Sequence, residues 1–232
     1  KPDSKAPNHI QSFIKTFQKS KKEFDYLKLE DQVVFFIKEN ENQEKNRIAG
    51  HTLRCKLDKD AKEIILIGEG NTCLTVAEGL VLSNYQFLKY FKEAKEKKYA
   101  LEKVNLVGEF DKQELIKLNE VLQAVYWARD MVNEPVSFLT ATQLSEEIAT
   151  LFENLPVSVS VLEKAKIEAL KMGGLLSVNK GSIEPPTFTI IQYKPKKATN
   201  KKPIVLVGKG VVYDTGGLSL KPTAGSMDLM KS

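Results

Sequence analysis

Cysteine and histidine are scarce in this chain. Its 232 residues include two cysteines, Cys55 and Cys73, and two histidines, His9 and His51. The sequence has no C-x-x-C pair and no H-E-x-x-H, which excludes a four-thiolate zinc site and a thermolysin-like zinc site. Two isolated cysteines are typical of reduced thiols in a cytosolic protein. We expect both histidines at surface or structural positions.

Long apolar runs and a strong net charge are also missing. No run approaches the 18 apolar residues of a membrane-spanning helix, and the N-terminal "KPDSKAPNHI" has no apolar signal core. The net charge of +5 is mild and the lysines are scattered among acids, which argues against a dedicated nucleic-acid binder. We therefore expect a cytoplasmic protein without a membrane partner.

The common glycine-rich motifs are incomplete. The triplets Gly68-Glu69-Gly70 and Gly208-Lys209-Gly210 begin like a dinucleotide fingerprint, but Cys73 and Tyr213 stand where its third glycine belongs. No G-x-S-x-G and no G-x-x-x-x-G-K-[ST] occurs. These gaps exclude a serine-hydrolase elbow and a P-loop.

What is present is a globular composition, with 42% hydrophobic and 28% charged residues. In the first part, patterning predicts a long helix over 72–93 and strands over four segments: 31–39, 48–57, 63–70 and 102–109. This alternation indicates an N-terminal α/β domain with a mixed sheet, residues 1–108. A strong helical pattern over 111–132, with Asp111 as N-cap, predicts a connecting helix and linker over 109–136.

The rest of the chain, 137–232, is expected to form a second α/β domain. Patterning predicts a helix over 140–152 capped by Thr142, and a helix over 163–174 that Gly173 closes. Strands are expected at 157–162, 188–193 and 203–208. The last of these, "PIVLVG", is apolar enough for the centre of a sheet covered on both faces.

The candidate chemistry lies just after that strand, in "VGKGVVYDTGGLSLKP". The glycines there allow tight backbone turns, which would place Lys209, Asp214 and Lys221 near the carboxyl end of the predicted strand. Open α/β sheets bind their ligands at that end. One carboxylate between two amines can form an ion-pair network or contribute to a metal centre. The spacing of these residues does not decide between the ion-pair network and the metal centre.

This stretch, followed by "MDLMKS", closely resembles the signature of the leucyl aminopeptidase family of two-metal exopeptidases. The segments "WARDMVNEP", "MGGLLSVNKGSIEPP" and "YKP" resemble further landmarks of that family in the same order. Residues 1–108 resemble the family only in their general α/β pattern, without a specific motif. The resemblance implies that 137–232 is the N-terminal part of a catalytic domain with three layers and a central sheet.

The resemblance also implies roles for four residues. Lys209 would be a ligand of the more loosely held metal, and Asp214 would bridge both metals. Lys221 would be the catalytic lysine that polarises the scissile carbonyl. Met230 would form a wall of the pocket for the first side chain of the substrate. Asp228 matches no ligand of the pattern, so we expect it to be structural.

The implied reaction is release of an N-terminal amino acid from a peptide, with a preference for leucine-like side chains. Two divalent ions, which can be zinc, manganese or magnesium in this family, would activate a water molecule. The resemblance further implies a homo-hexamer of the full-length protein.

The sequence departs from the family pattern after Ser232, where the pattern continues with further metal ligands. Of the five protein ligands in the pattern, only the two at Lys209 and Asp214 are present. We therefore expect this chain to be a fragment that is inactive alone. The alternative is a non-catalytic module that binds nucleic acid or mediates subunit assembly.

Overall fold

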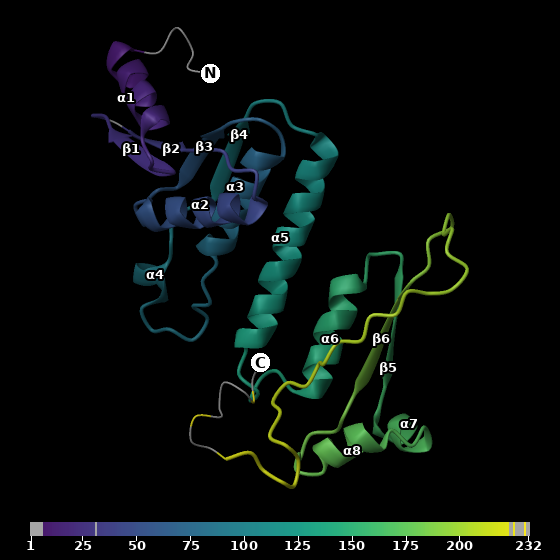
Figure 1. Ribbon diagram of the computed structural model, residues 1–232. Helices are drawn as coiled ribbons and strands as arrows, with labels where there is room; N and C mark the ends of the chain where they lie inside the picture. Colours follow the sequence, from purple (N-terminus) through teal and green to yellow (C-terminus); the bar gives the residue numbers. More distant parts are fainter. Residues whose placement is uncertain (1–6, 31, 223–224, 226–229, 231–232) are drawn as a thin grey trace. The chain divides into compact units, whose positions relative to one another are not determined.

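The computed structural model describes residues 7–30, 32–222, 225 and 230. Within them the chain divides into two compact units, Lys1–Trp127 and Ala128–Ser232, each described here by itself (Figure 1). Both combine helices with small sheets, which confirms the predicted α/β class.

The first unit contains two small sheets. Strands β1 (Phe24–Lys28) and β2 (Val33–Ile37) pair antiparallel, with Tyr26 opposite Phe35. Strands β3 (Glu63–Ile67) and β4 (Lys103–Val107) pair in parallel, with Ile65 opposite Asn105. Parallel neighbours need a crossover connection, and α3 (Gly70–Asn84) with the short α4 (Ala94–Lys97) lies in it.

Helices α1 and α2 also belong to the first unit, and α5 starts in it. Helix α1 (Asn8–Lys19) packs on the β1–β2 hairpin. The ring centroids of Phe13 on the helix and Phe36 on β2 lie 5.0 Å apart. Helix α2 (Gln43–Lys56) starts at Asn42, whose side chain accepts a hydrogen bond from the Glu44 N–H. The long α5 (Lys112–Asn133) matches the helix that the sequence predicts over 111–132.

The core of the first unit lies between α2, α3 and the strands. Its buried members are Leu53, Leu66, Cys73, Ala77, Leu80 and Leu101. Apolar burial of this kind is the main source of stability in a domain of this size.

Helices α2 and α3 lie side by side and touch through two glycines (Figure 1). A Cβ atom built at Gly50 would collide with the Val76 carbonyl oxygen, and one at Gly79 with the Arg47 carbonyl oxygen. Only glycine allows the two backbones to come this close.

The second unit begins at Ala128, within α5, and its next helix is α6 (Ala141–Phe152). The Thr140 side chain accepts there from the Gln143 N–H at 3.2 Å. Strands β5 (Val157–Leu162) and β6 (Phe188–Tyr193) pair antiparallel. Between them lie α7 (Lys164–Ala169) and α8 (Gly173–Asn179). The Ser145 hydroxyl ties α6 to β6 through hydrogen bonds with the Thr187 and Thr189 hydroxyls.

Five local predictions were wrong. The helix predicted over 72–93 ends at Asn84, the last residue of α3. Residues 48–57, predicted as a strand, belong to α2, since Asn42 caps a helix there that packs on α3. The cap of α6 is Thr140 in place of Thr142. Gly173 begins α8 instead of closing a helix; α7 ends at Ala169, and Lys171 takes the positive φ of 53°.

The last concerns "PIVLVG", which forms no strand. Ile204, Val205, Leu206 and Val207 are 73–92% exposed, and residues 203–208 join neither strand of the sheet that the described part of this unit contains. A strand exists only where a neighbour accepts its backbone hydrogen bonds, and the sequence pattern cannot show whether that neighbour is present.

Candidate functional site

The two lysines of the glycine-rich stretch, Lys209 and Lys221, both contact one carboxylate oxygen of Asp214. Lys209 Nζ donates to Asp214 Oδ2 at 2.8 Å, and Lys221 Nζ lies 3.1 Å from the same atom. The Lys209 side chain is 59% exposed, whereas that of Asp214 is only 20% exposed. The predicted grouping of these residues is therefore present, as a cation–anion–cation cluster open to solvent on the Lys209 side.

Backbone turns at two glycines bring Lys221 back to Asp214. Gly216 and Gly217 have φ values of 87° and 75°, in the region that side chains with a Cβ disfavour. Asp214 Oδ1 accepts from the Gly216 N–H at 3.3 Å, and the Lys221 N–H donates to the Thr215 carbonyl oxygen at 2.9 Å. A Cβ at Gly216 would lie 2.6 Å from the Ser219 carbonyl oxygen, so the turn depends on glycine.

The two lysines change the acidity of the carboxyl group between them. The Lys209 ammonium first, and then that of Lys221, lowers the pKa of Asp214 from 3.8 to about 2 by hydrogen bonding to its charged form. Partial burial opposes this shift and the Gly216 N–H adds to it. Asp214 is therefore a carboxylate at any physiological pH.

Met230 lies next to the cluster through its main chain. Its carbonyl oxygen accepts a hydrogen bond from the Asp214 N–H at 2.6 Å, and its side chain is buried. This contact holds Met230 close to the backbone of the carboxylate. Asp228, which we expect to be structural, lies outside the described residues.

The donor set of this cluster fits part of the coordination shell of a divalent ion. A carboxylate is a common ligand, and an amine can coordinate once its proton is lost. Among the residues that the structure describes, no group of three or more His, Cys, Asp and Glu side chains is placed to hold a metal. Lys209 and Asp214, the ligands that the family resemblance implies, therefore stay a prediction.

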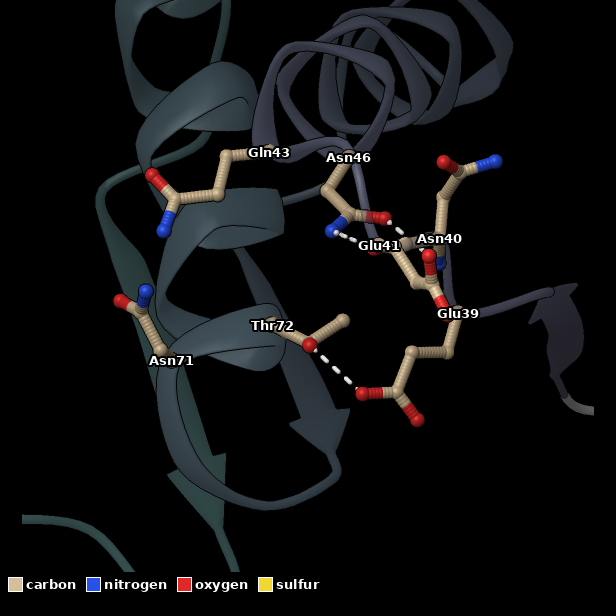
Figure 2. Close-up of a pocket in the computed structure, with 7 residues that line it drawn as sticks. All are labelled: Glu39, Asn40, Glu41, Gln43, Asn46, Asn71 and Thr72. Atoms are coloured by element: carbon tan, nitrogen blue, oxygen red, sulfur yellow. Dashed lines mark hydrogen bonds between the residues drawn. The ribbon is translucent and has the colours of Figure 1, made fainter.

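A polar pocket in the first unit was not predicted from the sequence. It has a volume of about 430 Å³ and lies at the starts of α2 and α3 (Figure 2). It is lined by Glu39, Asn40, Glu41, Gln43, Asn46, Asn71 and Thr72. The sequence did offer one sign of the helix that borders this pocket, because Asn42 is a good N-cap residue and α2 starts after it. The strand predicted over 48–57 was incompatible with that helix, so the pocket was missed.

Buried Asn46 shapes this pocket. Its side chain is 2% exposed, accepts from the Asn40 N–H at 3.1 Å and donates to the Asn40 carbonyl oxygen at 2.8 Å (Figure 2). Across the pocket the Thr72 hydroxyl donates to Glu39 at 2.7 Å. These contacts fix the loop before α2, and the pocket walls contain no lysine, histidine or cysteine.

We expect Asn46→Ala to lower the free energy of unfolding by about 1–3 kcal/mol, because it leaves the two main-chain groups of Asn40 without their partner. Chemical denaturation followed by circular dichroism measures this loss. Asn71→Ala is the matched control, since Asn71 lines the same pocket from an exposed position. Equal stability of both variants would contradict the role given to Asn46.

No helix within the described residues is both long and apolar enough to cross a membrane.

Comparison with known proteins bears on the second unit. Residues 126–232 match the model of the "Cytosol aminopeptidase family, catalytic domain". A probable cytosol aminopeptidase of Chlorobaculum tepidum is 54% identical over 105 residues, which cover 45% of this chain and 20% of that protein. Residues 126–232 belong to this family. The leucyl aminopeptidase resemblance seen in the sequence is thereby confirmed.

The similarity extends into the first unit. A probable cytosol aminopeptidase of a Sulfurihydrogenibium species is 32% identical over 206 residues, covering 84% of this chain and 40% of that protein. The chain thus spans less than half the length of these cytosol aminopeptidases.

Two solved structures share the fold. The bottromycin maturation enzyme BotP in complex with Mn has a TM-score of 0.71 and 26% identity, covering 90% of this chain and 46% of that one. A mutant of tomato leucine aminopeptidase has a TM-score of 0.67 and 20% identity, covering 81% of this chain and 41% of that one. Cytosol aminopeptidases therefore resemble this chain through both of its units.

Proposed function

We propose that this chain is part of a metal-dependent aminopeptidase that releases N-terminal amino acids, leucine-like ones by preference. The observation that carries the proposal is the meeting of Lys209 and Lys221 on one oxygen of Asp214. This cluster lies within the residues that match the family's catalytic domain. We further propose residues 1–108 as an N-terminal domain, 109–136 as a connector, and 137–232 as the first part of the catalytic domain.

Asp214 and Lys209 would hold the metal ions. Asp214 suits this role because its low pKa keeps both carboxylate oxygens charged and able to bridge two cations. Lys209 would have to lose a proton, and its exposed amine can pass that proton to water. Two divalent ions, when bound, would lower the pKa of a water molecule and polarise the substrate. The choice among zinc, manganese and magnesium is left open by this donor pair.

Lys221 would act on the substrate. Its ammonium is held by the glycine turn and by Asp214, so it presents a positioned charge. Where negative charge develops on the carbonyl oxygen of the scissile bond, a fixed cation stabilises it without reorganisation. Met230 would contribute a buried apolar surface to the pocket for the first side chain of the substrate.

Two further features belong to the proposal. The family's name supports a cytoplasmic location, and peptides are the substrates that an aminopeptidase takes. Assembly of the full-length protein into a homo-hexamer follows from the family resemblance.

We expect the 232-residue chain to show no turnover of leucine-p-nitroanilide with Mn²⁺, because Lys209 and Asp214 alone cannot complete a two-metal site. The full-length gene product should turn over the same substrate and lose activity with a chelator. A colorimetric assay of both proteins at equal concentration measures this. Robust turnover by the chain alone would overturn the claim of inactivity, and no turnover by the full-length product would overturn the proposed function.

A further inference from the structure

The glycine turn that carries Lys221 is packed against the end of α8, within the second unit (Figure 1). Gly217 is buried there, whereas its neighbours Gly216 and Leu218 are exposed. A Cβ atom built on Gly217 would lie 3.0 Å from the carbonyl oxygen of Ser177, in the last turn of α8. The turn therefore meets the main chain of the helix at a distance that leaves no room for a side chain.

Gly181, in the loop after α8, lies against the carbonyl group of the same residue. A Cβ at Gly181 would lie 3.2 Å from the Gly217 carbonyl oxygen and 3.4 Å from its carbonyl carbon, and its three nearest heavy atoms all belong to Gly217. The backbone of Gly181 is outside the left-handed region, so alanine suits it. A methyl group there would press on Gly217, which would have to give way by a few tenths of an ångström.

Hydrogen bonds hold the loop around Gly181 in place. The Ser182 N–H donates to the Asn179 carbonyl oxygen at 2.9 Å, and the Asn179 side chain donates to the Glu184 carbonyl oxygen at 2.9 Å. The Glu184 N–H donates in turn to the Ser182 hydroxyl at 3.1 Å. Because these bonds fix the loop, a group added at Gly181 should displace the glycine turn.

A displacement of Gly217 reaches Lys221 along a short path. The Thr215 hydroxyl accepts from the Gly217 N–H at 3.4 Å, and the Thr215 carbonyl oxygen accepts from the Lys221 N–H at 2.9 Å. The Lys221 side chain runs beside Gly216, since a Cβ built on Gly216 would lie 3.4 Å from Lys221 Cγ. The place of the ammonium, 3.1 Å from Asp214 Oδ2, thus depends on where Gly217 rests.

We propose that residues 177–181, the end of α8 and the loop after it, position Lys221 for its action on the substrate through main-chain contact with Gly217. This inference rests on the proposed function, in which Lys221 is the catalytic lysine. Gly181 is then a positioning residue, which acts through Gly217. A misplacement of about 1 Å can cost about 10²-fold in rate, so a shift of a few tenths of an ångström is enough for a measurable loss.

The kinetic test is Gly181→Ala in the full-length protein. We expect kcat to fall about three- to tenfold, because the added methyl group shifts the turn that carries Lys221. KM and manganese affinity should stay nearly unchanged, since Lys209 and Asp214 are both retained. Gly174→Ala is the matched control: it adds the same methyl group within α8, at a position where nothing lies within 4 Å of it.

A double-mutant cycle separates positioning from a general loss of structure. If Gly181 acts through Lys221, then Gly181→Ala should cause no further loss of kcat in a Lys221→Ala background. A purely structural defect would lower kcat by the same factor in both backgrounds, and that result would overturn the proposal.

Acetylation of the 232-residue chain by acetic anhydride, read by peptide mass spectrometry, tests the contact without peptidase activity. Lys221 should react at least about twofold faster in Gly181→Ala, since loss of its charge-assisted hydrogen bond to Asp214 frees the amine. Gly174→Ala should leave its rate unchanged, and exposed Lys196 is the internal reference. Unchanged acetylation of Lys221 beside an active full-length enzyme would overturn the positioning role alone, whereas no activity in any full-length variant would overturn the proposed function.

Discussion

Replacing Lys221 by alanine in the full-length protein should reduce kcat about 10²–10³-fold, the loss usual for removal of one group that stabilises developing negative charge. Metal affinity should change much less, since the two proposed ligands, Lys209 and Asp214, both remain when Lys221 is gone. Steady-state kinetics with leucine-p-nitroanilide gives kcat and KM, and a manganese titration of the same variant gives the metal affinity.

The control is Lys196→Ala, which removes an exposed lysine from the loop between β6 and the cluster and should leave both quantities unchanged. Lys221→Arg should recover part of kcat, because it restores a cation whose placement differs slightly. If Lys221→Ala lowers metal affinity as much as kcat, then Lys221 is a ligand or a folding element and its proposed role on the substrate is wrong.

The grouping of Lys209, Asp214 and Lys221 could be predicted from the sequence because it is a local property. All three lie within one short stretch whose turns are set by Gly216 and Gly217. Positive φ at consecutive glycines reverses the chain, and this reversal brings Lys221 to Asp214. The lowered pKa of Asp214 then follows from the two adjacent ammonium groups. The assignment of roles came from the family resemblance, since a lone carboxylate between lysines is also a common surface arrangement.

The strand predicted over 48–57 failed for a reason that lies outside that segment. Its pattern of apolar and β-branched residues suits a strand, but Asn42 caps a helix, and Gly50 allows that helix to approach Gly79 of α3. A contact between residues so far apart in sequence overrides local propensity.

The apolar segment 203–208 failed for the opposite reason. Its local pattern favours a central strand, yet Leu206 is 92% exposed and the segment joins no sheet in the described part of the unit. Whether an apolar run becomes a strand depends on a neighbouring backbone, which no pattern within the run reveals. The contact of Lys209 and Lys221 with Asp214 does not depend on that strand, because the glycine turn sets it.

The second large effect is expected at the crossing of α2 and α3. Gly79→Ala should lower the free energy of unfolding of the first unit by about 3 kcal/mol, at the upper end of what overpacking costs. The added Cβ would meet the carbonyl oxygen of Arg47, with the Cα of that residue 2.7 Å away, so main-chain atoms would have to move. A loss of this size is a large fraction of the 5–15 kcal/mol by which domains are stable.

Urea denaturation of the 232-residue chain, followed by circular dichroism and by hydrogen exchange of α2 and α3, measures the effect. Gly174→Ala is the matched control, because its Cβ would meet nothing within 4 Å. The double variant Gly50→Ala/Gly79→Ala adds a sharper test: once one Cβ has pushed the helices apart, the second costs less, so the two losses should sum to less than their separate values. Strictly additive losses, or a Gly79→Ala protein as stable as Gly174→Ala, would show that the two helices do not depend on close backbone contact at these glycines.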